Sequence, residues 1–67
     1  MDQKEIGIIL KERRKSLKIT QLDLADIAGV SVRSLRDIEK GKTNPELETL
    51  LNLCKVLGLE ISIKVIK

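Results

Sequence analysis

Residues 24–35 read LADIAGVSVRSL, and a glycine interrupts the helical pattern of apolar residues in this stretch. Leu24 and Ala28 precede Gly29 at helical spacing, and Leu35 resumes the apolar pattern after it. A glycine in the interior of a helix costs about 1 kcal/mol relative to alanine. The sequence therefore predicts two short helices that are separated by a turn at Gly29, rather than one continuous helix.

Capping side chains indicate where these two helices begin. Thr20 and Asp23 have the spacing of a capping box, which predicts a helix from there to the glycine. Ser31 is the next capping side chain and predicts a helix over residues 32–40. The glycine between them is expected to take the positive φ that the turn requires. Two short helices joined in this way make a helix-turn-helix, whose second helix projects from the surface.

A longer helix is predicted on each side of this pair. The first covers residues 3–17, and its apolar stripe consists of Ile6, Ile9, Leu10 and Leu17. The other begins at Asn44, where a capping side chain precedes a proline at the first helical position. It ends at Leu57, and its expected core-facing residues are Leu47, Leu50, Leu51, Cys54 and Leu57. Leu53 and Val56 lie off that stripe and indicate a second interface.

The last stretch, residues 59–67, has apolar residues at every second position. They are Leu59, Ile61, Ile63 and Val65. This alternation predicts a β-strand. Because a single strand leaves its backbone groups unpaired, its partner is expected to come from a second copy of the chain. The sequence thus predicts a mainly α, compact four- to five-helix domain over residues 1–58 and a dimerisation strand over residues 59–67, with Leu53 and Val56 as the alternative dimer contact.

The composition narrows the classes of function. The 67 residues include no His, one Cys and no aromatic residue, which argues against zinc clusters, disulfide frameworks and base stacking on aromatic rings. Without a nucleophile–base pair or a Gly-rich phosphate loop, we expect neither an enzyme nor a metal, cofactor or small-molecule ligand. No apolar run is long enough for a bilayer span or a signal peptide, so a cytoplasmic protein without membrane contact is expected. The net charge of +3 hints at an anionic partner.

Residues 20–53, TQLDLADIAGVSVRSLRDIEKGKTNPELETLLNL, resemble the Xre/Cro/CI class of helix-turn-helix DNA-binding domains, and the match extends over residues 14–57. With the alternating stretch that follows, the whole chain is similar to HipB-like antitoxins, in which such a strand pairs with its twin across a dimer. The resemblance implies a lambda-repressor-like fold and a homodimeric repressor of a palindromic operator. The implied partners are double-stranded DNA and a HipA-like kinase toxin. The alternative is a free-standing phage or host regulator without a toxin.

The resemblance also assigns DNA contacts. The base-reading positions fall on Val32, Arg33, Arg36 and Asp37. The phosphate-binding positions of the family fall on Gln21, Lys42, Thr43 and Asn44, and we expect Ser31 and Lys40 to contact phosphate as well. The alternatives are that Gln21 only opens its helix and that Lys40 makes no contact. Arginine can hold O6 and N7 of guanine with two hydrogen bonds, whereas Asp37 either accepts a hydrogen bond from cytosine N4 or orients a neighbouring arginine. Exposed arginines can also serve solvation alone, but the surrounding motif favours base reading.

Two further assignments concern structure and partners. The family pattern implies an ion pair between Arg14 and Glu39, with Arg13 as the competitor for the same carboxylate. Leu22 and Val32 are apolar where exposure is expected, which leaves open a protein-binding surface on a domain that no longer binds DNA.

Overall fold

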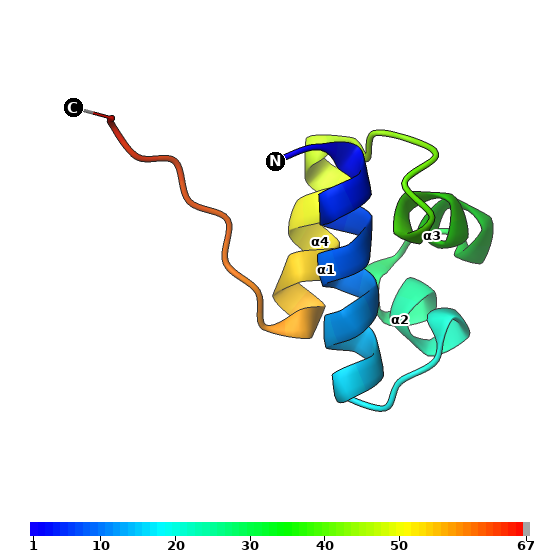
Figure 1. The fold of residues 1–67 in the computed structure, drawn as a ribbon. Coiled ribbons are helices and arrows are strands. Elements are labelled where there is room, and N and C mark those ends of the chain that lie inside the picture. The colour runs from blue at the N-terminus through cyan, green and yellow to red at the C-terminus, as the bar shows by residue number, and fades with distance from the viewer. Residues whose placement is uncertain (67) are drawn as a thin grey trace.

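Four helices carry the fold of residues 1–66, which are the residues that the computed structural model describes (Figure 1). They are α1 (Gln3–Ser16), α2 (Gln21–Ala28), α3 (Val32–Glu39) and α4 (Leu47–Leu57). The helices α1 and α4 lie side by side, and α2 and α3 pack on the side of them that faces away from the C-terminal tail. None of the four has the length and apolar character that a membrane span requires.

The helix-turn-helix predicted from the sequence is present in α2 and α3. Thr20 Oγ1 accepts a hydrogen bond from the backbone N–H of Asp23 at 3.0 Å, and Ser31 Oγ accepts one from Ser34 at 3.0 Å. Gly29 ends α2 in the left-handed conformation, with φ 73°. The two caps and the glycine therefore make the chain turn where their local chemistry predicts.

All four helices contribute to one apolar core. Its buried members are Leu10, Leu24, Ala25, Ala28, Leu35, Ile38, Leu53, Cys54 and Leu57. Burial raises the pKa of the Cys54 thiol, so this side chain acts as a small apolar residue of the core. Because short helices are marginal on their own in water, the shared core is what holds α2 and α3 in their helical form.

The helix α1 approaches the end of α3 very closely at Gly7. A Cβ atom at this position would overlap the carbonyl oxygen of Ile38 and lie 2.9 Å from that of Glu39. Only a residue without a side chain allows this approach.

The start of α4 differs from the prediction. The helix begins at Leu47, its capping position is Glu46, and no side chain caps it. Asn44 and Pro45 lie before it in the loop that leads from α3. The prediction that these two residues open the helix is therefore wrong, because the chain is still extended at Glu46, with φ −63° and ψ 150°.

The buried side of α4 also differs from the prediction. Leu53 is 0% exposed, whereas Leu51 is 47% exposed and Leu47 also faces solvent. The helix packs against both α1 and α2. The side of α4 that is buried therefore faces the space between these two helices and does not coincide with the predicted apolar stripe. Leu53 is thus a core residue, and its prediction as a dimer contact is wrong. Val56 is half-buried against the same core.

The buried side of α1 is narrower than the predicted stripe. Leu10 is fully buried and Ile6 packs partly against the core. Ile9 and Leu17 are exposed instead. Leu17 lies one residue past the end of α1, at its C-terminal capping position, so the helical stripe does not extend to it. Ile9 borders an open apolar hollow rather than the closed core.

The predicted C-terminal strand is absent from the described residues of the single chain. Leu59 packs partly against the core, but Ile63 is 97% and Val65 93% exposed on a tail that runs away from the helices (Figure 1). The physical reason is that a strand needs a partner strand for its backbone groups, and no other segment within residues 1–66 is a strand. Lys67, the last residue of the predicted strand region, lies outside the described residues.

Candidate nucleic-acid interface

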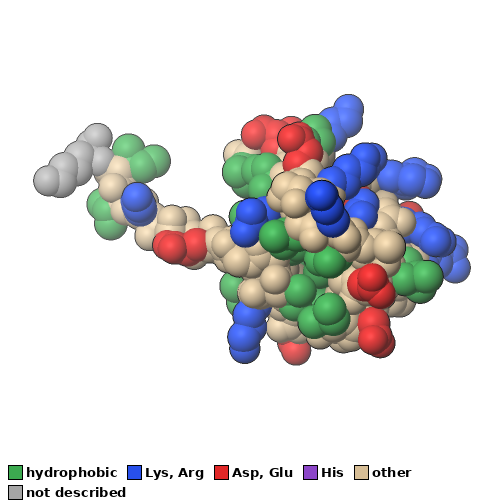
Figure 2. All heavy atoms as spheres, turned by 90° about the horizontal axis from the view of Figure 1, so that it is seen from below, with side chains coloured by type: hydrophobic (Ala, Val, Ile, Leu, Met, Phe, Trp, Pro, Cys, Tyr) green, Lys and Arg blue, Asp and Glu red, His purple; other side chains and the backbone are tan. Residues whose placement is uncertain are grey.

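The helix α3 turns one side to the core and the other to solvent. Leu35 and Ile38 are buried, whereas Arg33 and Arg36 are exposed. Lys40 follows them at helical spacing on the exposed side. Several Lys and Arg side chains gather on the side of the domain that faces away from the tail (Figure 2). This arrangement gives α3 a cationic face that is open to a large anionic partner.

The loop after α3 extends this exposed face. The predicted phosphate-binding residues Lys42, Thr43 and Asn44 are all exposed there. Ser31 is exposed at the opposite end of α3, where its hydroxyl already caps the helix. These side chains therefore flank the two exposed arginines at both ends of the helix.

Two of the predicted base-reading residues are less accessible. Val32 packs partly against the core, and Asp37 is half-buried. Within residues 1–66, Asp37 forms no side-chain hydrogen bond or ion pair with Arg33 or Arg36. In the free chain Asp37 therefore does not orient either arginine. Arg36 forms a hydrogen bond with a different residue, described below. Leu22, the other apolar residue noted for partner binding, is exposed on α2.

Four polar side chains form a chain of hydrogen bonds behind this face. Arg14 donates from Nε to Glu39 Oε2 at 2.7 Å and from Nη2 to Oε1 at 3.0 Å. Gln21 Nε2 donates to the same Oε1 of Glu39 at 2.9 Å. Arg36 Nε donates to Gln21 Oε1 at 3.3 Å. The hydrogen bonds thus run without a break from a buried ion pair to an exposed arginine.

The ion pair at the inner end of this chain is shielded from water. The side chains of Arg14 and Glu39 are 10% and 2% exposed. Arg14 Nη1 also donates to the Ile19 carbonyl at 2.9 Å, and no buried side-chain polar atom of the described residues lacks a partner. Arg13, the competitor, donates from Nε to the Leu57 carbonyl at 2.8 Å and so caps the end of α4. Arg14 rather than Arg13 therefore pairs with Glu39.

The environment of Gln21 is the feature that sequence reasoning missed. Both polar atoms of its side chain already have partners within the chain, Glu39 and Arg36. One hydrogen of Nε2 remains for a further acceptor. No spacing rule places Gln21 beside Arg36, because the contact depends on how α2 and α3 cross. Its position at the first residue of α2 was the only signal that the sequence carried.

The family of the chain follows from comparison with known proteins. The family model described as helix-turn-helix matches residues 10–64. An uncharacterised HTH-type transcriptional regulator of Haemophilus influenzae is 48% identical over 50 residues, which cover 75% of this chain and 51% of that protein. The immunity repressor protein of Bacillus phage phi105 is 40% identical over 57 residues, 85% of this chain and 40% of that protein. The chain thus spans about half or less of the length of these two relatives.

A solved structure supports the same assignment. The restriction-modification controller protein C.AhdI from Aeromonas hydrophila superposes with a TM-score of 0.82 at 28% sequence identity, over 87% of this chain and 88% of that one. The match therefore includes the arrangement of the helices as well as the sequence. This chain belongs to the helix-turn-helix family of the Xre/Cro/CI type, a family of transcription regulators.

Proposed function

We propose that this chain is a sequence-specific DNA-binding transcriptional repressor that acts as a homodimer on a palindromic operator. The observation that carries the proposal is the exposure of Arg33 and Arg36 on the second helix of a helix-turn-helix whose other side is buried. In this class of domain the second helix enters the major groove, where an arginine can hold guanine O6 and N7. The similarity to a phage immunity repressor supports a role in repression.

In this proposal the base contacts and the phosphate contacts come from different parts of the interface. Arg33 and Arg36 read bases, and Val32 and Asp37 contact the base pairs beside them through their partly exposed atoms. The phosphate contacts come from Gln21, Ser31, Lys40, Lys42, Thr43 and Asn44. Phosphate contacts fix the register of a protein on the duplex, whereas base contacts give the sequence preference.

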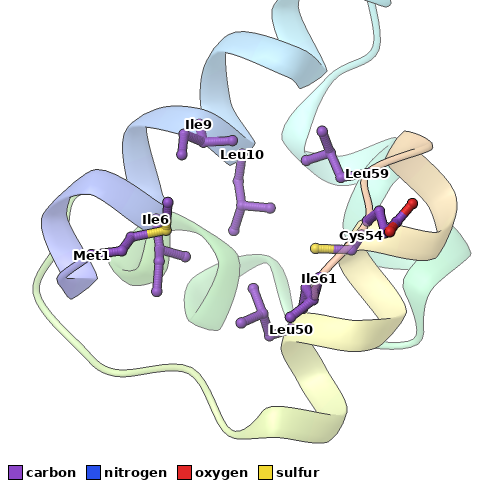
Figure 3. Close-up of a pocket in the computed structure, with 9 residues that line it drawn as sticks. Met1, Ile6, Ile9, Leu10, Leu50, Cys54, Leu59 and Ile61 are labelled. Atoms are coloured by element: carbon purple, nitrogen blue, oxygen red, sulfur yellow. The ribbon is translucent and has the colours of Figure 1, made fainter. Parts of the chain in front are cut away.

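The homodimer rests on apolar surface that the single chain leaves uncovered. The tail carries Ile63 and Val65 in the open, and near its start lies an open apolar hollow of about 220 Å³ (Figure 3). Side chains of α1, α4 and the first tail residues line it, among them Ile9, Leu50 and Ile61. Pairing two tails as antiparallel strands about a two-fold axis would satisfy their backbone groups and cover Leu59, Ile61, Ile63 and Val65.

Selection of bound duplexes from a random pool tests the proposal. The expected result is a two-fold symmetric consensus whose half-site centres lie about one helical turn, roughly 10 bp, or a multiple of it apart. Enrichment of a single half-site would contradict the dimer, and a pool without any enrichment would contradict sequence-specific binding.

Two versions of this proposal differ in whether a toxin partner controls the repressor. A HipB-like antitoxin held by a HipA-like kinase toxin is favoured by the alternating tail directly after the domain. A free-standing phage or host regulator is favoured by the similarity to the phage repressor. Purification from the native cell distinguishes them. A stoichiometric kinase-like partner supports the antitoxin, whereas a homodimer whose neighbouring gene is not toxic on its own supports the free-standing regulator.

A further inference from the structure

We infer that Gln21 is a positioning residue for base reading, which holds the guanidinium of Arg36 and anchors it on the buried Arg14–Glu39 pair. The inference rests on the proposed function, because Arg36 is a base-reading residue only there. It is distinct from a phosphate contact by Gln21, since a phosphate contact carries no base preference of its own.

The hydrogen bond determines which part of Arg36 remains available to DNA. Arg36 uses Nε as the donor to Gln21 Oε1. A guanidinium has five N–H donors in a planar fork, so those on Nη1 and Nη2 stay free. These two terminal nitrogens can still hold guanine O6 and N7 together. Gln21 therefore leaves the end of the fork open while it restricts the rotation of the side chain.

Gln21 is itself held in one orientation. Its Nε2 donates to Glu39 Oε1, a carboxylate oxygen that also accepts from Arg14. An amide turned the other way would place its oxygen against the carboxylate of Glu39 and its NH₂ group against the guanidinium of Arg36. Both contacts would be repulsive, so the charges on either side fix the direction of the amide. Three helices thus converge on the hydrogen bond that orients Arg36: α1 through Arg14, α2 through Gln21, and α3 through Glu39.

Arg33 provides an internal comparison. Within residues 1–66, the side chain of Arg33 forms no hydrogen bond or ion pair with the rest of the chain, so it keeps its rotamer freedom until DNA binds. Arg36 has part of that freedom removed in advance. A change at Gln21 should therefore alter the contribution of Arg36 and leave that of Arg33 unchanged.

A double-mutant cycle tests this dependence. The probe is the duplex that the wild-type protein selects from a random pool, together with its single-base variants. Gln21→Met keeps the length of the side chain and removes both hydrogen bonds. In the wild-type background, Arg36→Ala should weaken binding by about ten- to a hundredfold. In the Gln21→Met background the same change should cost about three- to tenfold less than in the wild-type background, because Gln21→Met has already removed the part of the Arg36 contribution that depends on its fixed orientation.

Two further measurements make the double-mutant cycle specific: the base preference of each variant, and the effect of a control substitution at Arg33. Gln21→Met should reduce the preference at the base pair that Arg36→Ala affects and at no other. Arg33→Ala should cost the same in both backgrounds, since additivity is expected for residues without a shared contact. If the losses from Gln21→Met and Arg36→Ala multiply, or if Gln21→Met weakens all duplexes equally, then Gln21 contacts phosphate only. The inference then fails while the proposed function stands.

A measurement without DNA separates the two failures. In ¹⁵N NMR spectra of the free wild-type protein, the Nε–H of Arg36 should exchange with water more slowly than that of Arg33. Equal exchange would overturn the inference whatever the DNA experiments show. Slower exchange at Arg36 in a protein that selects no duplex would overturn the proposed function and retain the contact. The inference and the proposed function are both supported if exchange at Arg36 is slow in the wild type and becomes faster in Gln21→Met, and if the double-mutant cycle shows that the two residues are coupled.

Discussion

At Gly7 the absence of a side chain lets the backbone of α1 lie against the carbonyl groups that end α3. The same region is joined by a hydrogen bond from Gln3 Nε2 to the Gly41 carbonyl at 2.8 Å. The start of α1 therefore supports the end of α3, which is where the exposed cationic loop begins. One residue without a Cβ atom thus contributes to the direction in which the candidate DNA-binding helix points.

We predict that Gly7→Ala lowers the stability of the domain. Alanine is the better helix former by about 1 kcal/mol, but its methyl group would overlap backbone atoms that can move only if a helix moves. Overpacking of this kind typically costs about 1–3 kcal/mol. Urea unfolding should show the loss, whereas Glu12→Ala on the exposed side of α1 should stay within about 0.5 kcal/mol of wild type. An increase in stability for Gly7→Ala would mean that α1 and α3 are not this close.

Removal of one member of the Arg14–Glu39 pair should be costly. Glu39→Gln keeps the shape of the side chain but leaves the buried guanidinium of Arg14 without its counter-charge. Breaking a buried pair from one side costs about 3–5 kcal/mol, which approaches the whole stability of a domain of this size. Thermal and urea unfolding measure the loss. The double variant Arg14→Met with Glu39→Met should recover much of it, because no buried charge is left. A Glu39→Gln variant that unfolds like wild type would show that the pair is open to water.

At the scale of the elements, the parts of the fold that could be predicted are those fixed within a few residues. Thr20 and Ser31 cap helices by bonding to backbone groups three residues on, and Gly29 ends α2 by its own conformation. The start of α4 could not be predicted in this way, since it depends on how far the loop must travel from α3. The candidate site divides similarly. The exposure of Arg33 follows from helical geometry, whereas the contact between Gln21 and Arg36 requires the crossing of α2 and α3.

The buried side of α4 provides a matched test at this scale. Leu53 and Leu51 are the same residue type, two positions apart on one helix, yet only Leu53 is buried. Leu53→Ala should cost about 2–5 kcal/mol of unfolding free energy because it leaves a cavity in the core. Leu51→Ala should cost less than about 1 kcal/mol in the monomer. If Leu51→Ala lowers the free energy of unfolding as much as Leu53→Ala or more, then α4 is buried along the apolar stripe that the sequence predicts.

At the scale of the whole molecule, the tail and the cationic face lie on opposite sides of the α1–α4 pair (Figures 1 and 2). Association through the tails would therefore leave α3 uncovered. One copy presents two exposed arginines on α3, and each bidentate contact with a base contributes about 1–3 kcal/mol of discrimination. Two copies on a symmetric site double the number of such contacts. In the proposed dimer, the sequence specificity of this small domain would therefore depend on having two copies on the operator.

The tail can be tested without disturbing the helices by the paired change Ile63→Lys and Val65→Lys. Both side chains are almost fully exposed in the single chain, so the unfolding of the helical unit should not change. The two charges should prevent the tails from pairing, and sedimentation should show a monomer. Binding to the selected duplex should fall by about 10²–10⁴-fold as the second half-site is lost.

Because the added charges are positive, weaker DNA binding by this variant can be attributed to the loss of the dimer. Two extra lysines on their own would strengthen attraction to phosphates, so weaker binding cannot come from simple electrostatics. Deletion of the chain after Gly58 should have the same effect on assembly, although it also removes Leu59 from its place against the core. If the paired variant and the deletion both remain dimeric, the tail is not the interface. The contact then belongs to the exposed side of α4, where Leu47 and Leu51 are the apolar residues that face solvent.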